Sequence, residues 1–298
     1  MLEDFKAVNE LFPIVFQIAS FVFGAIVGSF LNVCIYRIPA KRSIITPGST
    51  CACGKPIAWY DNIPILSWFI LRGKARCCNS PYSFRYPAVE TLTGALFLFA
   101  WLNYTPDLAG IMMFFIALLI CASFIDLDTM EIPDRFSIGT AFFGVLIAVA
   151  LPQLHGNASS EYYIFNSTRS FFDAVIGLMV GSGIILWIGI VADKVLNKDS
   201  MGMGDVKLMG GIGAFLGWKG AIFSIFGGAV LGTIGISIAL ILQNIIPSLR
   251  AKKGEIAFGK HIPFGPMLAG GAIAYALFLR DYVDLYFNSV VDTLGNNF

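Results

Sequence analysis

Acidic residues gather at two places where an apolar stretch meets a polar one. The segment from Ser123 to Asp134 follows an apolar run and holds four acids within nine residues: Asp126, Asp128, Glu131 and Asp134. The second place is Asp205, which follows Gly202-Met203-Gly204 and opens onto another apolar run. A carboxylate at the edge of a membrane-length segment is costly unless it has a partner or a function. We therefore expect Asp126 and Asp205 to converge into a catalytic pair.

Two carboxyl groups a few ångströms apart can hydrolyse a peptide bond without a metal or a nucleophilic side chain. Because like charges resist sharing one site, such a pair holds a single proton near neutral pH. The ionised group takes a proton from water while the protonated group polarises the carbonyl. The sequence contains no Gly-x-Ser-x-Gly and no His-Glu-x-x-His motif, which argues against serine and zinc peptidases. As an alternative, Asp134 and Asp205 could each cap the helix that follows.

The composition is that of a membrane protein. Hydrophobic residues make up 57% of the 298 positions and charged residues only 13%, whereas soluble domains carry about 25% charged residues. At roughly 20 residues per crossing, the pattern predicts an all-α polytopic membrane protein with about eight transmembrane helices. They are expected at residues 13–36, 88–104, 108–126, 136–152, 171–193, 207–218, 220–245 and 263–283. No cleavable signal peptide is evident, because the first apolar run is too long and has no cationic segment before it.

The distribution of Lys and Arg predicts which face of the membrane each loop occupies. The positive-inside rule places the basic loops in the cytoplasm. Of the 20 Lys and Arg, only four fall on the other face: Lys6, Arg169, Lys219 and Arg280. Both termini are then periplasmic, and Asp126 and Asp205 lie at the cytoplasmic boundary. Residues 154–168 are expected to be a solvated connector, and the scattered basic residues give no indication of nucleic-acid binding.

Residues 37–87 are predicted to form a small cytoplasmic loop domain. Four of the six cysteines lie in it: Cys51, Cys53, Cys77 and Cys78. A domain of about fifty residues buries little core, so it needs extra stabilisation from a disulfide or a bound metal. A disulfide is disfavoured in the reducing cytoplasm. A tetrathiolate zinc site is the natural alternative. Four unligated thiols in a loop held by membrane contacts would also fit the sequence.

Several motifs give the chain a resemblance to one known family. They are Gly28–Val33 with Tyr36–Pro39, Trp59–Pro64, Arg85–Pro87 with Glu90, Asp126–Asp134, Gly202–Leu208 and Pro263–Pro266. By these motifs the sequence resembles the bacterial type IV prepilin leader peptidase/N-methyltransferases, which also process type II secretion pseudopilins. The resemblance implies a bifunctional enzyme of the bacterial inner membrane. Such an enzyme cleaves the leader peptide of a prepilin at the cytoplasmic face. It then methylates the new N-terminal residue, usually Phe, with S-adenosylmethionine.

The resemblance also implies a domain order and roles for single residues. Residues 1–36 hold the N-terminus and the first transmembrane helix, residues 37–87 the cysteine-containing loop domain, and residues 88–298 the transmembrane aspartic peptidase domain. Asp126 and Asp205 match the catalytic aspartates of the family. The zinc-binding region of the family, with two Cys-x-x-Cys pairs, matches the four loop cysteines. Here the first pair is shortened to Cys-x-Cys, and Ala75 stands where the second pair begins.

The methyltransferase site is expected in the loop and at its junction with the second transmembrane helix. Trp59, Asp61 and Glu90 are the residues expected to contribute to S-adenosylmethionine binding. Glu90 could instead be an ordinary cap at the start of its helix. Arg37 and Arg85 are expected to contact the phosphate groups of membrane lipid or to anchor the loop.

Three other functions fit parts of the sequence. The protein could be a peptidase that has lost methyltransferase activity, because the loop is the part that departs from the family pattern. A proton-coupled transporter would place its acids near mid-span, whereas Asp126 and Asp205 lie at one edge. A zinc-loop scaffold without catalysis would tolerate Asp126→Asn.

Overall fold

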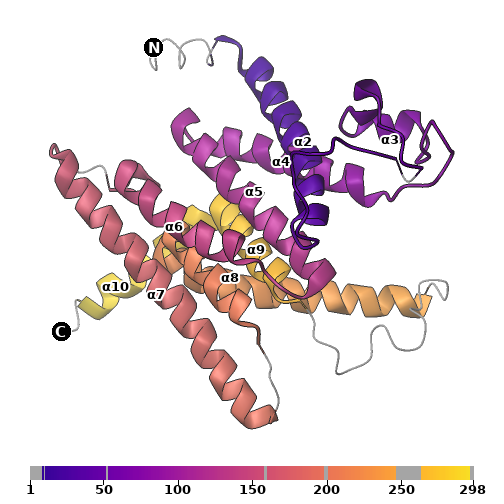
Figure 1. Ribbon diagram of the computed structural model, residues 1–298. Helices are drawn as coiled ribbons and strands as arrows, with labels where there is room; N and C mark the ends of the chain where they lie inside the picture. The colour runs from indigo at the N-terminus through magenta and orange to yellow at the C-terminus, as the bar shows by residue number, and fades with distance from the viewer. Residues whose placement is uncertain are drawn as a thin grey trace. The chain divides into compact units, whose positions relative to one another are not determined.

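The computed structural model describes residues 9, 11–51, 53–157, 160–197, 201–245 and 263–295. Over this part of the chain the fold is helical, with two isolated β-bridges in the cysteine loop (Figure 1). The all-α class that the sequence predicts is confirmed. The basic residues at 250–260, Lys198 and His261 lie outside the described residues.

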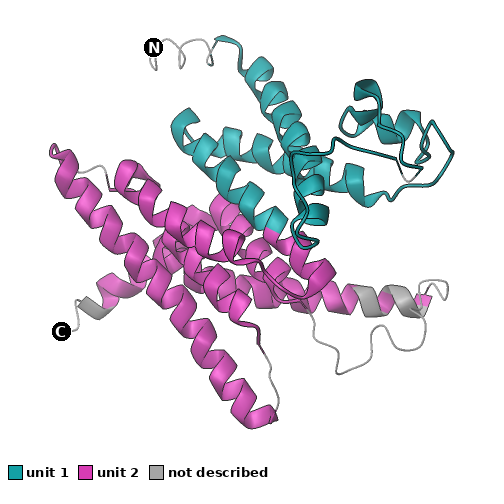
Figure 2. Cartoon of the chain, viewed as in Figure 1, with its two compact units in different colours: residues 1–121 teal, residues 122–298 magenta. Residues whose placement is uncertain are grey.

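The chain packs as two compact units, Met1–Cys121 and Ala122–Phe298 (Figure 2). The division falls inside one helix, whereas the sequence-based boundary was drawn after residue 87. The first unit therefore keeps the cysteine loop together with the two helices that flank it. The second unit contains both Asp126 and Asp205.

The first unit is built on the packing of α2 (Pro13–Arg37) against α4 (Arg85–Asn103). Glycines let the two backbones approach closely: a Cβ built at Gly24 would lie 2.8 Å from the Cα of Gly94, and one at Gly28 would lie 2.8 Å from the Cα of Glu90. Small residues at helix interfaces are typical of membrane proteins. Between the two helices the loop forms a short 3₁₀ turn, η1 (Trp59–Asn62), and one short helix, α3 (Leu66–Ile70).

The helix α5 (Pro106–Thr129) begins in the first unit and ends in the second. The remaining elements of the second unit are α6 (Asp134–Ala150), η2 (Pro152–His155), α7 (Tyr163–Leu196), α8 (Met203–Ile245), α9 (Gly265–Ala274), the π-helical segment η4 (Tyr275–Leu279) and α10 (Arg280–Gly295). The predicted connector at 154–168 is wrong in part, because η2 and the first turns of α7 lie within it. Asn157 and Asn166 are buried in this segment. The side chain of Asn157 donates a hydrogen bond to the Asp173 carboxylate, and that of Asn166 donates to the Ser160 carbonyl.

The long helix α8 reverses its direction at Gly217, where φ is 72° and ψ is 178°. A Cβ built at Gly181 of α7 would lie 2.5 Å from the carbonyl oxygen of Met209 and 3.3 Å from the Cβ of Ala221. In one straight helix those two residues would be about 18 Å apart along the axis. The segments before and after Gly217 therefore form a helical hairpin against α7, while the separate membrane crossings at 207–218 and 220–245 stay a prediction.

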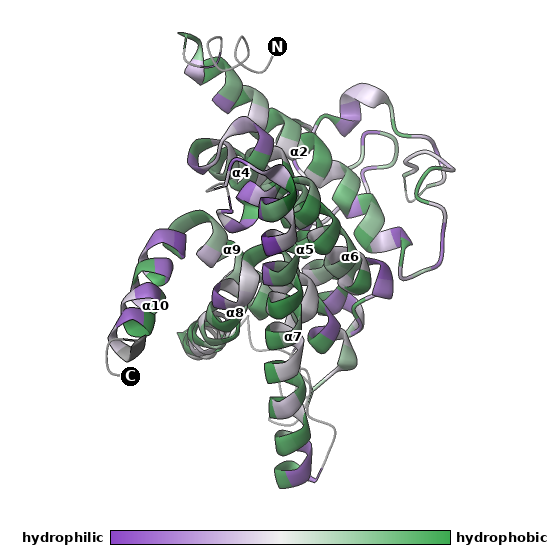
Figure 3. Ribbon diagram, turned by 90° about the vertical axis from the view of Figure 1, so that its left-hand side faces the viewer, coloured by the Kyte–Doolittle hydropathy of each residue, from purple (hydrophilic) through white to green (hydrophobic). Residues whose placement is uncertain are grey.

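Four described helices are each long and apolar enough to cross a membrane: Pro13–Arg37, Pro106–Thr129, Tyr163–Leu196 and Met203–Ile238. Figure 3 shows hydrophobic residues along most of α7, and the side chains of Met179 and Trp187 on it are exposed. Large exposed apolar side chains on a long helix are expected where lipid is the solvent. The protein is thus a membrane protein, while the count of about eight crossings stays a prediction.

Candidate active site

Asp126 is held at the end of α5 by a contact from a distant part of the chain. Its side chain is 5% exposed. Its Oδ2 accepts a hydrogen bond of 3.1 Å from the backbone N–H of Gly265, the first residue of α9. The neighbouring acids Asp128, Glu131 and Asp134 are exposed, so Asp126 is the buried acid of its cluster.

Asp205 lies in the first turn of α8 and is 9% exposed. Its backbone N–H donates to the carbonyl of Gly202 (3.1 Å), while its Oδ1 is buried without a hydrogen-bond partner among the described residues. The N-cap alternative is therefore wrong for Asp205, because α8 already begins at Met203 and Asp205 is inside the helix. It is wrong for Asp134 also: Pro133 occupies the cap position, and Asp134 forms an ion pair with Lys207 (2.7 Å).

The two aspartates line one cavity of about 260 Å³ in the second unit. Its other lining residues come from the α5–α6 connection and the start of α8: Met130, Glu131, Ile132, Asp134, Gly202, Met203, Gly204 and Lys207. The carboxyl groups of Asp126 and Asp205 are close enough to interact electrostatically. A cavity with two buried acids can hold a water molecule and a polarised carbonyl together.

Two contacts of Ile132 fix this arrangement, and the sequence analysis did not anticipate them. Ile132 is buried after the left-handed turn at Met130, and it contacts both Gly204 and Gly265: a Cβ built on either glycine would lie 3.2 or 3.1 Å from it. Larger residues at these glycines would push Ile132 and the acids apart. Gly265 belongs to the Pro263–Pro266 motif, which the sequence analysis noted without placing it at the aspartates.

The four loop cysteines come together in the first unit. Their sulfur atoms all lie within 4.8 Å of one another, with Cys51 Sγ 3.4 Å from Cys78 Sγ and Cys53 Sγ 3.3 Å from Cys77 Sγ. Four thiolates bound tetrahedrally to zinc at about 2.3 Å would be about 3.8 Å apart. The donor set therefore fits zinc.

Two tight turns present the cysteines. In the first turn, Cys51 N–H donates to the Lys55 carbonyl (2.8 Å), and Gly54 adopts a left-handed φ of 82°. In the second turn, Ala75 N–H donates to the Ser80 carbonyl (2.9 Å). Cys77, two residues after Ala75, supplies the sulfur that Ala75 lacks, so the unusual spacing still brings four sulfurs together.

The thiols of this cluster titrate unequally. The backbone N–H of Cys53 and the neighbouring thiols lower the pKa of Cys51 to about 6, whereas hydrogen bonding to Cys51 and Cys53 raises the pKa of Cys77 to about 12. One thiolate thus forms readily, and its negative charge opposes the next ionisation. A bound cation would remove that opposition, which is a physical reason for a metal at this place.

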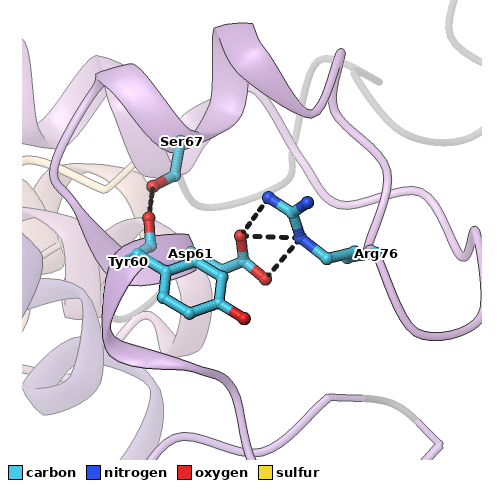
Figure 4. A network of polar contacts seen from close by, with 4 residues as sticks. All are labelled: Tyr60, Asp61, Ser67 and Arg76. Carbon is cyan, nitrogen blue, oxygen red and sulfur yellow. Dashed lines mark hydrogen bonds and ion pairs between the residues drawn. The ribbon is translucent and has the colours of Figure 1, made fainter.

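The predicted methyltransferase residues Trp59, Asp61 and Glu90 lie in the first unit, each with different contacts. Asp61 forms an ion pair with Arg76 through hydrogen bonds of 2.7 to 3.0 Å (Figure 4). Trp59 is 80% exposed. Glu90 is 8% exposed and accepts a hydrogen bond of 2.6 Å from the backbone N–H of Ile65.

The capping alternative for Glu90 is wrong, because its carboxylate binds the loop and not the free end of α4. The residue lies more than a turn inside the helix that begins at Arg85. Its partner Ile65 has a φ of 64°, an unusual conformation for a β-branched residue. Such backbone persists only where the surroundings impose it, so Glu90 fixes the loop immediately after the Trp59–Pro64 motif.

Comparison with known proteins places both units in one family. Residues 22–104 match the family described as the bacterial peptidase A24 N-terminal domain, and residues 113–237 match the type IV leader peptidase family. The chain is 32% identical to a prepilin leader peptidase/N-methyltransferase of Pectobacterium carotovorum subsp. carotovorum, over 91% of this chain and 96% of the relative. A protein of the same name from Aeromonas hydrophila is 33% identical over 84% and 86%.

A third relative of that name, from Myxococcus xanthus (strain DK1622), is 37% identical over 74% of this chain, and the match spans 63% of that relative's length. No solved structure was found to match the chain. The matches to the family cover both the cysteine loop and the two aspartates. The chain belongs to the type IV leader peptidase family.

Proposed function

We propose that the protein is a prepilin leader peptidase and N-methyltransferase in which Asp126 and Asp205 are the two catalytic carboxyl groups. The observation that carries this proposal is their shared cavity, where both side chains are buried at the ends of apolar helices. Family membership favours this enzymatic function over a transporter or a scaffold. The substrates are type IV prepilins, and type II secretion pseudopilins are proposed as a second group.

The geometry supports a division of work between the two acids. The ionised carboxyl takes a proton from a water molecule as the water oxygen attacks the scissile carbonyl carbon. The other, protonated, donates a hydrogen bond to the carbonyl oxygen, and the proton taken from water passes to the leaving nitrogen as the C–N bond breaks. The Gly265 N–H fixes the orientation of Asp126, while the unpartnered Oδ1 of Asp205 is available to water or substrate.

The enzyme is a bacterial inner-membrane protein in this proposal, with both termini in the periplasm. The basic loops then face the cytoplasm, and so do the two aspartates. A prepilin that carries its apolar helix in the membrane would present its scissile bond at the same boundary. Membrane lipid is the proposed contact of Arg85, whereas Arg37 donates hydrogen bonds to the carbonyls of Ser43 (3.0 Å) and Gly48 (3.3 Å) and is proposed to anchor the loop.

Methyl transfer is assigned to the first unit, with S-adenosylmethionine as the methyl donor. Trp59, Asp61 and Glu90 are the proposed contributors to that site. Cys51, Cys53, Cys77 and Cys78 would hold zinc, which would staple the loop and take no part in the chemistry.

The experiment that tests the catalytic assignment uses the purified full chain in detergent with a leader-bearing prepilin. Mass spectrometry reads both the cut and the added methyl group. Asp126→Asn and Asp205→Asn should each abolish cleavage, because a pair with one carboxyl cannot both activate water and stay protonated. An Asn at position 126 still offers an oxygen to the Gly265 N–H, so the fold should survive.

Asp128→Asn is the matched control, because this exposed acid follows Asp126 on the same helix by two residues. It should cleave at a rate close to that of the unaltered chain. Cleavage at the unaltered rate by Asp126→Asn or Asp205→Asn would remove that residue from the mechanism.

A further inference from the structure

The short helix α3 exposes its apolar side. Leu66, Phe69 and Ile70 are 58%, 59% and 70% exposed, and their spacing of three and four residues places them on one face. The opposite side is occupied by Ser67, which is buried, and by Trp68, whose Nε1 donates to the Tyr82 carbonyl (3.3 Å). A helix of a water-soluble domain has the reverse arrangement, with its apolar face toward the core.

The 3₁₀ turn η1 adds further exposed apolar residues beside this helix. Ser67 connects the two elements: its Oγ donates to the Tyr60 carbonyl (3.3 Å), as Figure 4 shows, and its N–H donates to the Ile63 carbonyl (3.1 Å). We call the exposed apolar residues of α3, together with Tyr60 of η1 and Ile63 between them, the apolar face of the loop: Tyr60, Ile63, Leu66, Phe69 and Ile70.

The apolar face is held in place by the rest of the first unit. Glu90 of α4 binds the Ile65 N–H directly before α3. After α3, Gly73 N–H donates to the Trp68 carbonyl (2.9 Å), and the rings of Trp68 and Phe84 pack edge to face with centroids 5.1 Å apart. These contacts hold the backbone of α3 in place while the side chains of the apolar face stay exposed, so the surface has a defined structure.

The charge of the loop indicates what this surface contacts. Residues 37–87 contain eight Lys and Arg but a single acid, Asp61, which Arg76 already pairs. Arg72 and Lys74 follow α3 directly, and both are exposed. A surface that combines exposed aromatic and aliphatic side chains with flanking cations is typical of elements that lie in the interface of an anionic membrane.

We propose that the apolar face of the loop inserts into the boundary between headgroups and acyl chains, with Arg72 and Lys74 on the phosphates of anionic phospholipid. The loop begins at the end of α2, a helix that can span the membrane, and ends at the start of α4, which packs against α2. Both ends therefore tether it close to a bilayer. The proposal rests on the membrane insertion proposed above and requires neither of the two catalytic activities.

The test measures quenching of tryptophan fluorescence by brominated lipid in vesicles that contain the full chain. All five native Trp are replaced by Phe, and one Trp is then present at position 69, through Phe69→Trp, or at the native position 68. Adjacent positions point about 100° apart around a helix, so the two chains form a matched pair. A third chain keeps only Trp187, which is exposed on α7, and reports lipid contact on a spanning helix.

In vesicles with anionic lipid, bromine near the headgroup should quench the Phe69→Trp chain at least about twofold more strongly than the Trp68 chain. Adding Arg72→Gln and Lys74→Gln should lower that quenching to its value in neutral vesicles. Equal quenching at positions 68 and 69, or none at 69 while Trp187 is quenched, would overturn the proposal. So would cross-linking of position 69 to a second copy of the chain, since a protein would then cover the face.

Prepilin cleavage by the chain with native Trp is measured in parallel, which keeps the two proposals distinguishable. Absence of quenching at position 69 while prepilin is cleaved normally counts against the proposed lipid contact alone. Normal quenching in a chain that never cleaves prepilin counts against the proposed function alone.

Discussion

Replacing Gly265 with Ala would move the Asp126 carboxylate without changing its chemistry. A Cβ at this position would lie 2.7 Å from Asp126 Oδ2 and 3.1 Å from Ile132 Cδ1. Gly265 does not have a left-handed φ, so Ala adopts the same backbone and the effect comes from the added methyl group alone. The oxygen must retreat by about 0.7 Å to reach ordinary van der Waals contact at 3.4 Å.

The expected consequence is a large loss of cleavage rate together with a measurable loss of stability. A misplacement of about 1 Å at a catalytic group can reduce the rate about 100-fold, so a shift of this size should reduce cleavage by about 10- to 100-fold. Overpacking of one methyl group costs about 1–3 kcal/mol. The assay is the initial rate of prepilin cleavage in detergent, with methylation of a peptide that starts at the mature residue measured in parallel. Methylation should be unchanged, because Gly265 lies in the second unit.

Gly139→Ala in α6 is the matched control. A Cβ there has no heavy atom within 4 Å, and Ala in a helix interior is favoured over Gly by about 0.5–1 kcal/mol. This control should cleave at the unaltered rate. If Gly265→Ala also cleaves at that rate while remaining folded, the position of the Asp126 carboxylate does not control the reaction, and the reasoning is wrong.

Three further predictions concern other parts of the chain. Metal analysis should find one zinc per chain. Cys53→Ser should lose the zinc and make the loop more sensitive to protease, whereas the control Cys34→Ser should retain it. Absence of zinc, with all four loop thiols freely alkylated, would refute the site. Glu90→Ala removes the acceptor that holds Ile65 and should yield cleaved but unmethylated pilin, whereas parallel loss of both activities would make Glu90 purely structural. Burial lowers the pKa of His155 from 6.5 to about 4. The unfolded chain therefore binds the additional proton first, and stability should fall by about 3 kcal/mol between pH 6.5 and 4. Thermal unfolding should show a smaller fall in His155→Gln, and an equal fall in both chains would contradict this.

The sequence by itself determined the all-α membrane class and singled out two acids, Asp126 and Asp205, that the structure buries in one cavity. Apolar runs of membrane length have few alternatives to helices, because backbone groups in lipid must be satisfied within the segment. The same reasoning marks acids at the ends of such runs as costly, which separates Asp126 and Asp205 from ordinary surface acids. The four loop cysteines were likewise expected to form one cluster, because the loop has too little core to fold without a staple.

Tertiary structure alone decided how these residues are held. Asp126 and its partner Gly265 are 139 positions apart, and no local pattern indicates that the N-terminus of α9 meets the end of α5. The partner of Glu90 depends in the same way on close packing of α2 against α4, which sets where the loop meets the helix. Local periodicity specifies which residues are helical and which are buried. Contacts between backbones at glycines depend on how whole helices fit together, so the orientation of the two buried aspartates follows from packing.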